Sequence, residues 1–67
     1  MIKVYICEDD TKQLQTLQQL VSKVIIERQL DMGFGLTSAD LHEILAHVKS
    51  QQPTQAVFLL DIALNSD

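Results

Sequence analysis

The hydrophobic positions of the first half of the chain change from a strand period to a helical one. Residues 4 to 7 are apolar at consecutive positions, which is typical of a strand covered on both faces. Across residues 11–29, apolar side chains fall at helical spacing between glutamines and charged residues, which predicts an amphipathic helix of about five turns. Asp10 or Thr11 can cap its first turn. The apolar stripe comprises Leu14, Leu17, Leu20, Val21, Val24, Ile25 and Ile26.

The second half repeats the alternation with shorter elements. Residues 31–36 alternate apolar side chains with two glycines, which predicts a weak strand suited to the edge of a sheet. Thr37 or Ser38 is the predicted N-cap of a second helix. Its apolar stripe comprises Leu41, Ile44, Leu45 and Val48.

The second helix should end by Gln52, because Pro53 disfavours a helical conformation at the residue before it. Residues 56–60 are continuously apolar and form the third predicted strand. The order strand, helix, strand, helix, strand implies parallel βαβ units with right-handed crossovers. The 67 residues form one small α/β domain. A chain of this length buries about 60% of the surface that its unfolded state exposes.

Composition and charge exclude several classes of function. The net charge is −4 and the five Lys and Arg residues are scattered, so we expect no direct binding of nucleic acid, which requires a basic patch. Cys7 is the single cysteine and belongs to an apolar run, which indicates a buried, reduced thiol in the cytoplasm. No apolar run approaches the ~20 residues needed to cross a bilayer, and we expect no membrane contact.

Two acidic strand ends carry the candidate chemistry. The first strand runs into Glu8, Asp9 and Asp10, and the third runs into Asp61. The carboxyl ends of neighbouring parallel strands meet in the crevice where ligands bind, and clustered carboxylates repel unless a proton or a hard cation neutralises them. We predict an Mg²⁺ site with Asp9 and Asp61 as ligands, Glu8 binding directly or through water, and the backbone carbonyl of Ala63 as a further ligand.

A carboxylate beside such a metal can also attack phosphorus. Asp61 is the better nucleophile because it stands alone at its strand end. Two simpler interpretations remain open from the residues alone. The acidic run 8–10 can be a helix N-terminal cluster that the helix dipole favours, and Asp61 can be an ordinary strand-ending residue.

Two stretches carry a resemblance to a known family. Residues 6–10 read ICEDD before the first helix, and residues 58–62 read FLLDI. Together they resemble the first half of a bacterial response-regulator receiver domain. More narrowly, they are similar to the accessory gene regulator A and competence-regulator branch, in which the receiver is usually followed by a LytTR-type DNA-binding domain.

The resemblance implies a partial flavodoxin-like, doubly wound parallel sheet with strand order 2-1-3. Glu8 and Asp9 match the metal-binding acidic pair of the family, Asp61 matches its phosphoacceptor, and Ala63 matches the residue that gives a backbone carbonyl to Mg²⁺. The partner implied is a sensor histidine kinase, and the parent protein would regulate transcription. The domain itself is not expected to be an enzyme.

The chain also departs from the family. Receivers have five strands, a Ser or Thr after the fourth and a Lys after the fifth, whereas this chain stops before strands 4 and 5, six residues after Asp61. We therefore expect most of a metal site but an incomplete switch. The third strand would then be an exposed apolar edge that favours homo-oligomers. The alternative function is a truncated interaction module that self-associates or pairs with intact receivers.

Two enzyme classes place acids at similar strand ends, and neither fits well. Haloacid-dehalogenase-type phosphatases begin with D-x-D-x-T, but residues 8–11 read EDDT. Toprim-type nucleases need a D-x-D, and residues 61–63 read DIA, which lacks the second acid.

Overall fold

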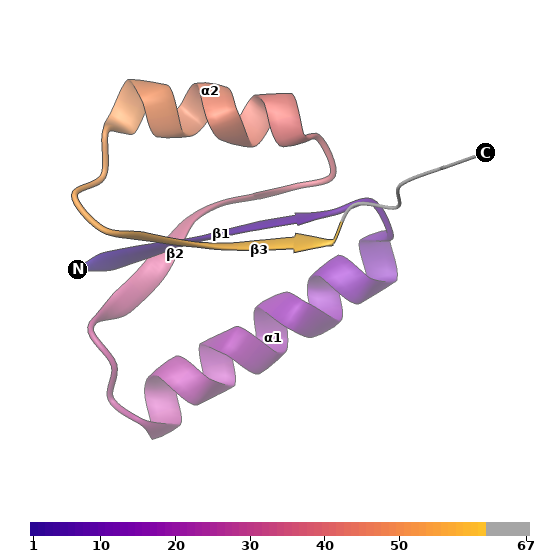
Figure 1. Cartoon of the computed structure of the whole chain (residues 1–67). Coiled ribbons are helices and arrows are strands. Elements are labelled where there is room, and N and C mark those ends of the chain that lie inside the picture. Colours follow the sequence, from indigo (N-terminus) through magenta and orange to yellow (C-terminus); the bar gives the residue numbers. More distant parts are fainter. Residues whose placement is uncertain (62–67) are drawn as a thin grey trace.

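The computed structural model describes residues 1–61 as strands and helices in alternation (Figure 1). The bounds of the elements are β1 (Ile2–Glu8), α1 (Thr11–Glu27), β2 (Met32–Ser38), α2 (Leu41–Gln51) and β3 (Ala56–Asp61). The predicted order of elements is confirmed. None of the helices in this part of the chain is long and apolar enough to cross a membrane.

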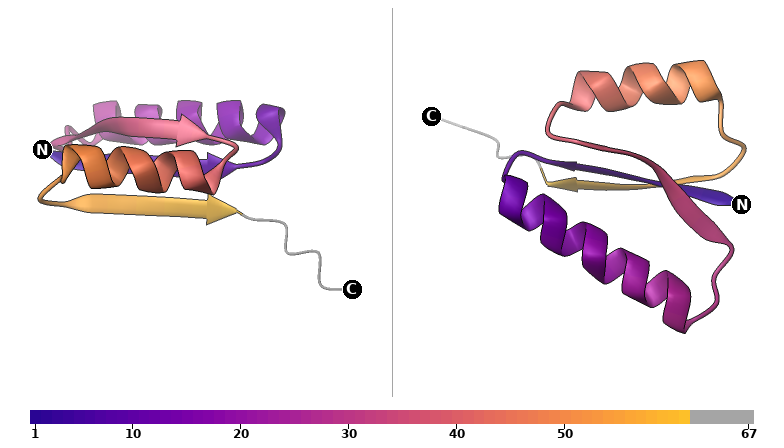
Figure 2. Two further views of the ribbon diagram at one scale, coloured as in Figure 1. Left: turned by 90° about the horizontal axis from the view of Figure 1, so that it is seen from above. Right: turned by 180° about the vertical axis from the view of Figure 1, so that it is seen from behind.

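The strands form one parallel sheet with the order β2-β1-β3. Helix α1 lies on one face and α2 on the other (Figure 2). This arrangement confirms the predicted partial flavodoxin-like fold, with β2 at an edge and β1 in the centre. The connections are short, so each helix returns the chain to the same end of the sheet.

The core is built around the central strand. Val4, Tyr5, Ile6 and Cys7 of β1 are buried, as the run of apolar residues predicts. Successive side chains of a strand point to opposite faces, and Tyr5 and Cys7 pack against Ile44 of α2. The two remaining side chains therefore face α1, which covers Val4 and Ile6 on the opposite side.

Helix α1 is covered less completely than its sequence predicts. The stripe was expected to face the core, but none of its residues is fully buried, and the side chains of Leu20 and Ile26 are 59% and 72% exposed. The expectation is wrong for these two residues because α1 packs on β1 and β2 and leaves the side of β3 open. An entirely apolar groove of about 290 Å³ lies there, bounded by Val24 of α1 and by Val57 and Leu59 of β3.

The helix N-caps follow the sequence in one case and depart from it in the other. Asp10 caps α1 as predicted, since its Oδ1 accepts hydrogen bonds from the Lys12 and Gln13 amides at 2.9 and 3.2 Å. The N-cap of α2 is Asp40, so the prediction of Thr37 or Ser38 is wrong. Strand β2 continues to Ser38, two residues beyond its predicted end, because it keeps pairing with β1.

A residue with positive φ follows the end of each helix. Helix α1 stops at Glu27, two residues earlier than predicted, and Gln29 has φ 51°. Helix α2 stops at Gln51, and Gln52 has φ 46°. The predicted end before Pro53 is therefore confirmed.

A β-bulge marks the pairing of β1 with β2. Val4 pairs with Phe34 and Tyr5 pairs with Leu36, so Gly35 is the extra residue. A Cβ atom built on Gly35 would overlap the ring of Tyr5. The glycine thus lets the backbone of β2 approach the largest side chain of the core.

We predict that Gly35→Ala lowers the free energy of unfolding by about 1–3 kcal/mol, the usual cost of overpacking a core. Gly33→Ala is the matched control, because its Cβ would meet only the flexible end of Met1, with Sδ at 2.9 Å. Urea unfolding followed by circular dichroism measures both. Equal losses in the two variants would contradict the role assigned to Gly35.

Candidate functional site

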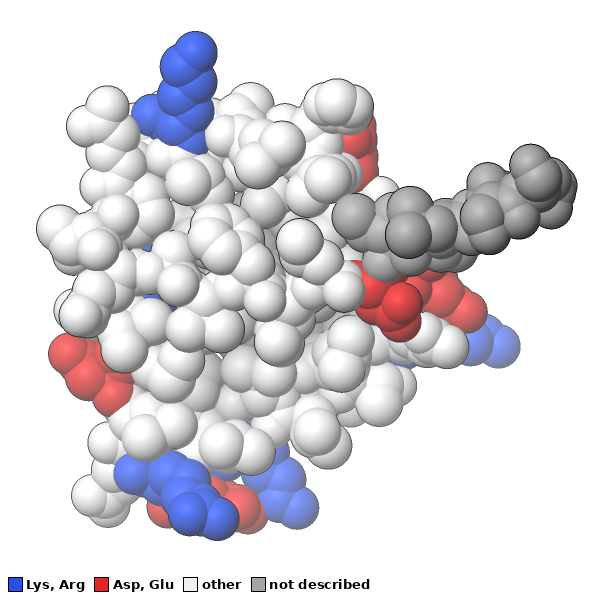
Figure 3. Space-filling model, in the orientation of Figure 1, with Lys and Arg blue, Asp and Glu red and all other residues white. Residues whose placement is uncertain are grey.

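The two acidic strand ends lie side by side at the carboxyl edge of the sheet. Strands β1 and β3 are neighbours, and their last residues, Glu8 and Asp61, are direct register partners. Figure 3 shows acidic side chains gathered at this end of the molecule. The predicted juxtaposition of these two carboxylates is therefore present.

Glu8 is the buried member of the pair, with a side chain only 2% exposed. Its Oε1 accepts a hydrogen bond of 3.0 Å from the amide of Asp10. Its Oε2 is buried and has no hydrogen-bond partner among the described residues. Buried polar atoms are rarely left unsatisfied, so this oxygen is a position where a proton or a cation would be stabilising.

The surroundings of Glu8 raise its pKa. The amide of Asp10 acts in the opposite direction and lowers the pKa, because it donates to the carboxylate. The neighbouring carboxyl of Asp61, burial, and the nearby Asp9 together outweigh it, and the pKa of Glu8 lies above its ordinary value of 4.5. The site favours neutralisation of its negative charge.

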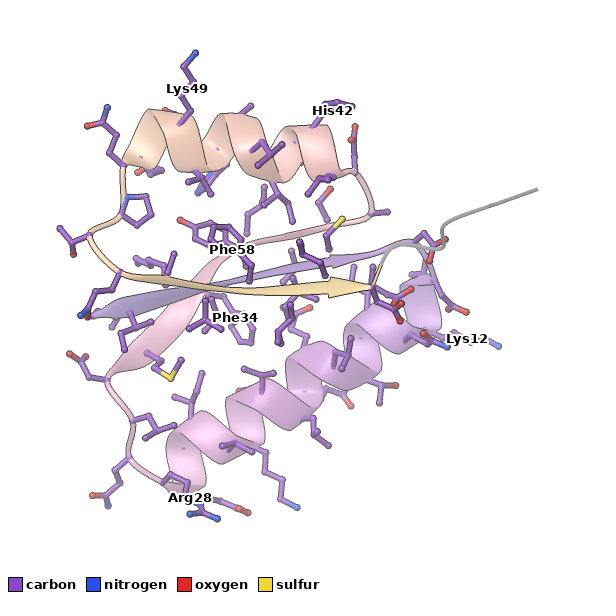
Figure 4. All side chains as sticks on the ribbon, viewed as in Figure 1. Lys12, Arg28, Phe34, His42, Lys49 and Phe58 are labelled. Atoms are coloured by element: carbon purple, nitrogen blue, oxygen red, sulfur yellow. The ribbon has the colours of Figure 1, made fainter. Side chains whose placement is uncertain are left out.

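The other two acids of the first strand end have different roles. Asp9 and Asp10 are both exposed. The carboxylate of Asp10 is occupied by the N-cap of α1, and Lys12 follows in the first turn at this end of the molecule (Figure 4). The carboxylate of Asp9 makes no capping hydrogen bond of this kind within residues 1–61. Asp9 is thus the acid that can turn toward Glu8 and Asp61.

The end of β2 adds polar residues that the sequence analysis did not assign to the site. Ser38 is buried and its hydroxyl donates to Glu43 Oε2 at 3.0 Å, while the amide of Asp40 donates to the same hydroxyl at 3.0 Å. These groups satisfy one another at the start of α2. The place of Ser38 could have been predicted, because a parallel strand that ends at residue 38 brings that residue to the same edge of the sheet as Glu8 and Asp61.

Cys7 is a core residue, as predicted. Its thiol is buried, and burial raises its pKa, with smaller contributions from Asp40, Asp9 and Glu8. A buried thiol with a raised pKa is a poor nucleophile, so Cys7 takes no part in the candidate chemistry.

The described residues provide part of a binding site for a hard divalent cation. Residues 1–61 contain no group of three or more His, Cys, Asp or Glu side chains already placed to hold a metal ion. The adjacent carboxylates of Glu8, with its unpartnered Oε2, and of Asp61 nevertheless supply the oxygen donors that Mg²⁺ prefers. Mg²⁺ also commonly keeps several water ligands. The predicted ligand Ala63 lies outside the described residues. Mg²⁺ binding therefore stays a prediction.

Comparison with known proteins identifies homologues. Over 66 residues, which is 98% of this chain, the sequence is 30% identical to accessory gene regulator protein A of Staphylococcus aureus strain N315. The same values hold for accessory gene regulator protein A of strain MW2 and accessory gene regulator A of strain COL. No family model matches the chain, and no solved structure matches it.

The homology confirms the resemblance on which the sequence analysis drew. The chain spans 27% of the length of these relatives. A relation to proteins named as gene regulators agrees with the response-regulator interpretation of the acidic strand ends.

We predict that Glu8→Gln stabilises the chain at neutral pH without divalent metal. The native state holds the Glu8 proton more tightly than the unfolded chain does, so wild-type stability falls as pH rises from the ordinary value of 4.5 through the raised pKa. The amide keeps an acceptor for the Asp10 amide and carries no charge. Urea unfolding in chelator should show a more stable variant at pH 7 and no difference well below pH 4.5.

The control is Glu27→Gln, which removes an exposed carboxylate from α1. It should leave the pH dependence of unfolding as in the wild type. Lower stability of Glu8→Gln at both pH values would contradict the destabilising effect assigned to the negative charge of Glu8.

Proposed function

We propose that this chain is a phosphoacceptor receiver module of a two-component response regulator, with Asp61 as the residue that a histidine kinase phosphorylates. The observation that carries the proposal is the pairing of Glu8 with Asp61 at the carboxyl edge, beside a buried carboxylate oxygen without a partner. A solvated acidic turn would not place a carboxylate that is 2% exposed next to a second acid. The homology to gene regulators supports the same conclusion.

The exposure of Asp61 suits an acceptor. It is the last residue of β3 and is open to solvent, so a phosphoryl donor on another protein can reach it. A carboxylate oxygen of Asp61 attacks phosphorus in line while the bond from phosphorus to the donor imidazole nitrogen breaks. The imidazole leaves with the electron pair and takes a proton from water, and Asp61 becomes an acyl phosphate.

The proposed cofactor is Mg²⁺, held by Glu8, Asp9 and Asp61 with the backbone carbonyl of Ala63. When bound, it would neutralise the negative charge of the carboxylates and of the incoming phosphoryl oxygens. Glu8 is fixed by its strand position and by the Asp10 amide, so it can orient a ligand shell. Asp9 can supply the second carboxylate without giving up a structural contact.

The wider role is part of the same proposal and rests on the resemblance to response regulators. The parent protein would receive the phosphoryl group from a sensor histidine kinase in the cytoplasm and control transcription through a separate LytTR-type DNA-binding domain. The net charge of −4 of the 67-residue sequence does not favour direct contact with nucleic acid. The module accepts a group and is not itself an enzyme.

A second candidate function is an interaction module that self-associates. The observation that favours it is the outer edge of β3, where Phe58 and Leu60 are 43% and 52% exposed. An apolar strand with an open edge can pair with another chain. This function needs no phosphoryl chemistry and is compatible with the first.

We predict that acetyl phosphate and Mg²⁺ add one phosphoryl group to the chain. Asp61→Asn should abolish the adduct in intact-mass spectrometry, because an amide cannot form the acyl phosphate. Asp31→Asn is the matched control, since Asp31 is an exposed acid at the opposite end of the sheet, 3.5 Å from the terminal amine. An adduct that persists in Asp61→Asn would exclude Asp61 as the acceptor.

We predict that millimolar Mg²⁺ raises the melting temperature of the wild-type chain, because a ligand bound by the native state alone stabilises it by mass action. Asp9→Ala should lose the Mg²⁺ response, and Asp31→Ala should retain it. A differential scanning fluorimetry titration measures the three proteins. An Mg²⁺ response of Asp9→Ala equal to that of the wild type would refute the metal assignment.

A further inference from the structure

A cavity of about 250 Å³ lies at the amino end of the sheet, beside the carboxyl end of α2. Within residues 1–61, no residue of β3 lines it. The cavity is therefore formed without the outer edge of that strand and does not depend on what pairs there. Its lining includes Lys3 and Tyr5 of β1, Gly35 of β2, His47 and Gln51 of α2, and Thr54 of the connection from α2 to β3.

The cavity is separate from the acidic edge of the sheet. Lys3 lies near the start of β1, and Glu8 is the last residue of the same strand. At about 3.3 Å per residue, the two positions are about 16 Å apart. A small ligand in the cavity would not contact the acidic pair, so binding there is independent of the proposed phosphoacceptor function.

The cavity adjoins a buried hydroxyl group that lacks a partner. Tyr5 is only 1% exposed, and its ring is held by stacking on Phe58 and by an edge contact with His47, with centroids 5.3 and 6.0 Å away. Its hydroxyl makes no hydrogen bond with any other group of residues 1–61. Buried polar groups nearly always have a partner, so this hydroxyl can bond to water or to a ligand in the cavity.

Gly35 keeps the space beside this hydroxyl open. A Cβ atom built on Gly35 would lie 2.8 Å from the hydroxyl oxygen of Tyr5, so any other residue would fill that space. Gly35 is also the bulge residue of β2. Bulges are common next to binding sites, and glycine within a strand often marks a place where a ligand approaches the backbone closely.

The charge of the lining favours an anion. Lys3 is half-buried, and no Asp or Glu of residues 1–61 lines the cavity, although the chain carries a net charge of −4. Asp31 is paired with the terminal amine at 3.5 Å. The carboxyl end of α2 contributes about half a negative charge, but Lys3 carries a full positive one. The amide of Gln52 also occupies the carbonyl of Val48 there, at 2.8 Å.

We propose that this cavity binds a small organic oxyanion, which is an apolar body that carries one carboxylate or phosphate group. The ammonium group of Lys3 would neutralise the oxyanion, and the hydroxyl of Tyr5 and the side chains of Gln51 and Thr54 offer hydrogen-bond donors. The ring of His47 offers a surface for the apolar body. The ligand must be small, because the volume lies below the range of about 300–1,000 Å³ that is usual for ligand pockets.

The first experiment uses Tyr5 as the reporter. It is the only tyrosine of the sequence, so the NMR signals of isotope-labelled tyrosine report on the cavity alone. Benzoate and phenyl phosphate should shift these signals to saturation, with dissociation constants in the millimolar range. Benzamide has the shape of benzoate without its charge and should bind about tenfold more weakly, because hydrogen bonds to a charged group are the stronger ones.

The outcomes of this titration separate the possible ligands. Tighter binding of phenyl phosphate would assign the site to phosphates, and tighter binding of benzoate would assign it to carboxylates. Inorganic phosphate should bind more weakly than phenyl phosphate, because it lacks the apolar body. The proposal would be overturned by benzamide binding as tightly as benzoate, or by the absence of a saturable shift with both organic anions.

The second experiment removes the cation. Lys3→Met keeps the apolar stem and should weaken the binding of the preferred anion about tenfold. Lys49→Met is the matched control, because it removes the same charge from an exposed position on the outer side of α2 (Figure 4). Its binding should equal that of the wild type. Equal losses in the two variants would show attraction by overall charge and would overturn a site at Lys3.

The third experiment removes the hydroxyl group. Tyr5→Phe keeps the ring, so its free energy of unfolding in urea should equal or exceed that of the wild type, because the hydroxyl has no partner to lose. The binding of benzoate, followed by the line width of its own NMR signals, should weaken about tenfold. Reduced stability with unchanged benzoate binding would show that the hydroxyl serves the core and not a ligand, which would overturn the proposal.

Discussion

The structure depends on β1 holding both of its neighbours in parallel register. Val4 to Cys7 of this strand form most of the buried core, and the same strand ends in Glu8. Because β3 is in register with β1 along its whole length, packing at Tyr5 and Phe58 also fixes Asp61 beside Glu8. The position of the acidic pair is thus a consequence of hydrophobic packing several residues away. The pairing of Glu8 with Asp61 is therefore set by the register of the sheet.

The sequence predicted the fold well where one interaction dominates. The continuous apolar runs and the helical stripes predicted the order of the elements, and Pro53 predicted the end of α2. Each of these signals is local. The N-cap of α2 was missed because pairing of Ser38 with β1 extended β2 past its apolar alternation. The exposure of Leu20 and Ile26 was missed for a different reason. A stripe shows which face is apolar, but the width of the sheet decides whether that face is covered.

The acidic site was predictable in part. The strand-end positions of Glu8 and Asp61 follow from the parallel topology, and Asp10 was identified as a possible cap. The sequence did not show which of these acids would cap α1 and which would be buried. It depends on side-chain rotamers that give Asp10 to the helix start and bury one oxygen of Glu8 without a partner. Nor could sequence show that Ser38, Asp40 and Glu43 satisfy one another nearby.

The buried thiol of Cys7 has a consequence for how the sheet moves. It lies one residue before Glu8 on the central strand, between β2 and β3, and it is shielded and held in its protonated form. A thiol reagent can reach it only when the sheet or its α2 cover opens. The native chain therefore carries an internal reporter of local unfolding, and the labelling rate of this single sulfur measures how often the strands that position the acidic pair come apart.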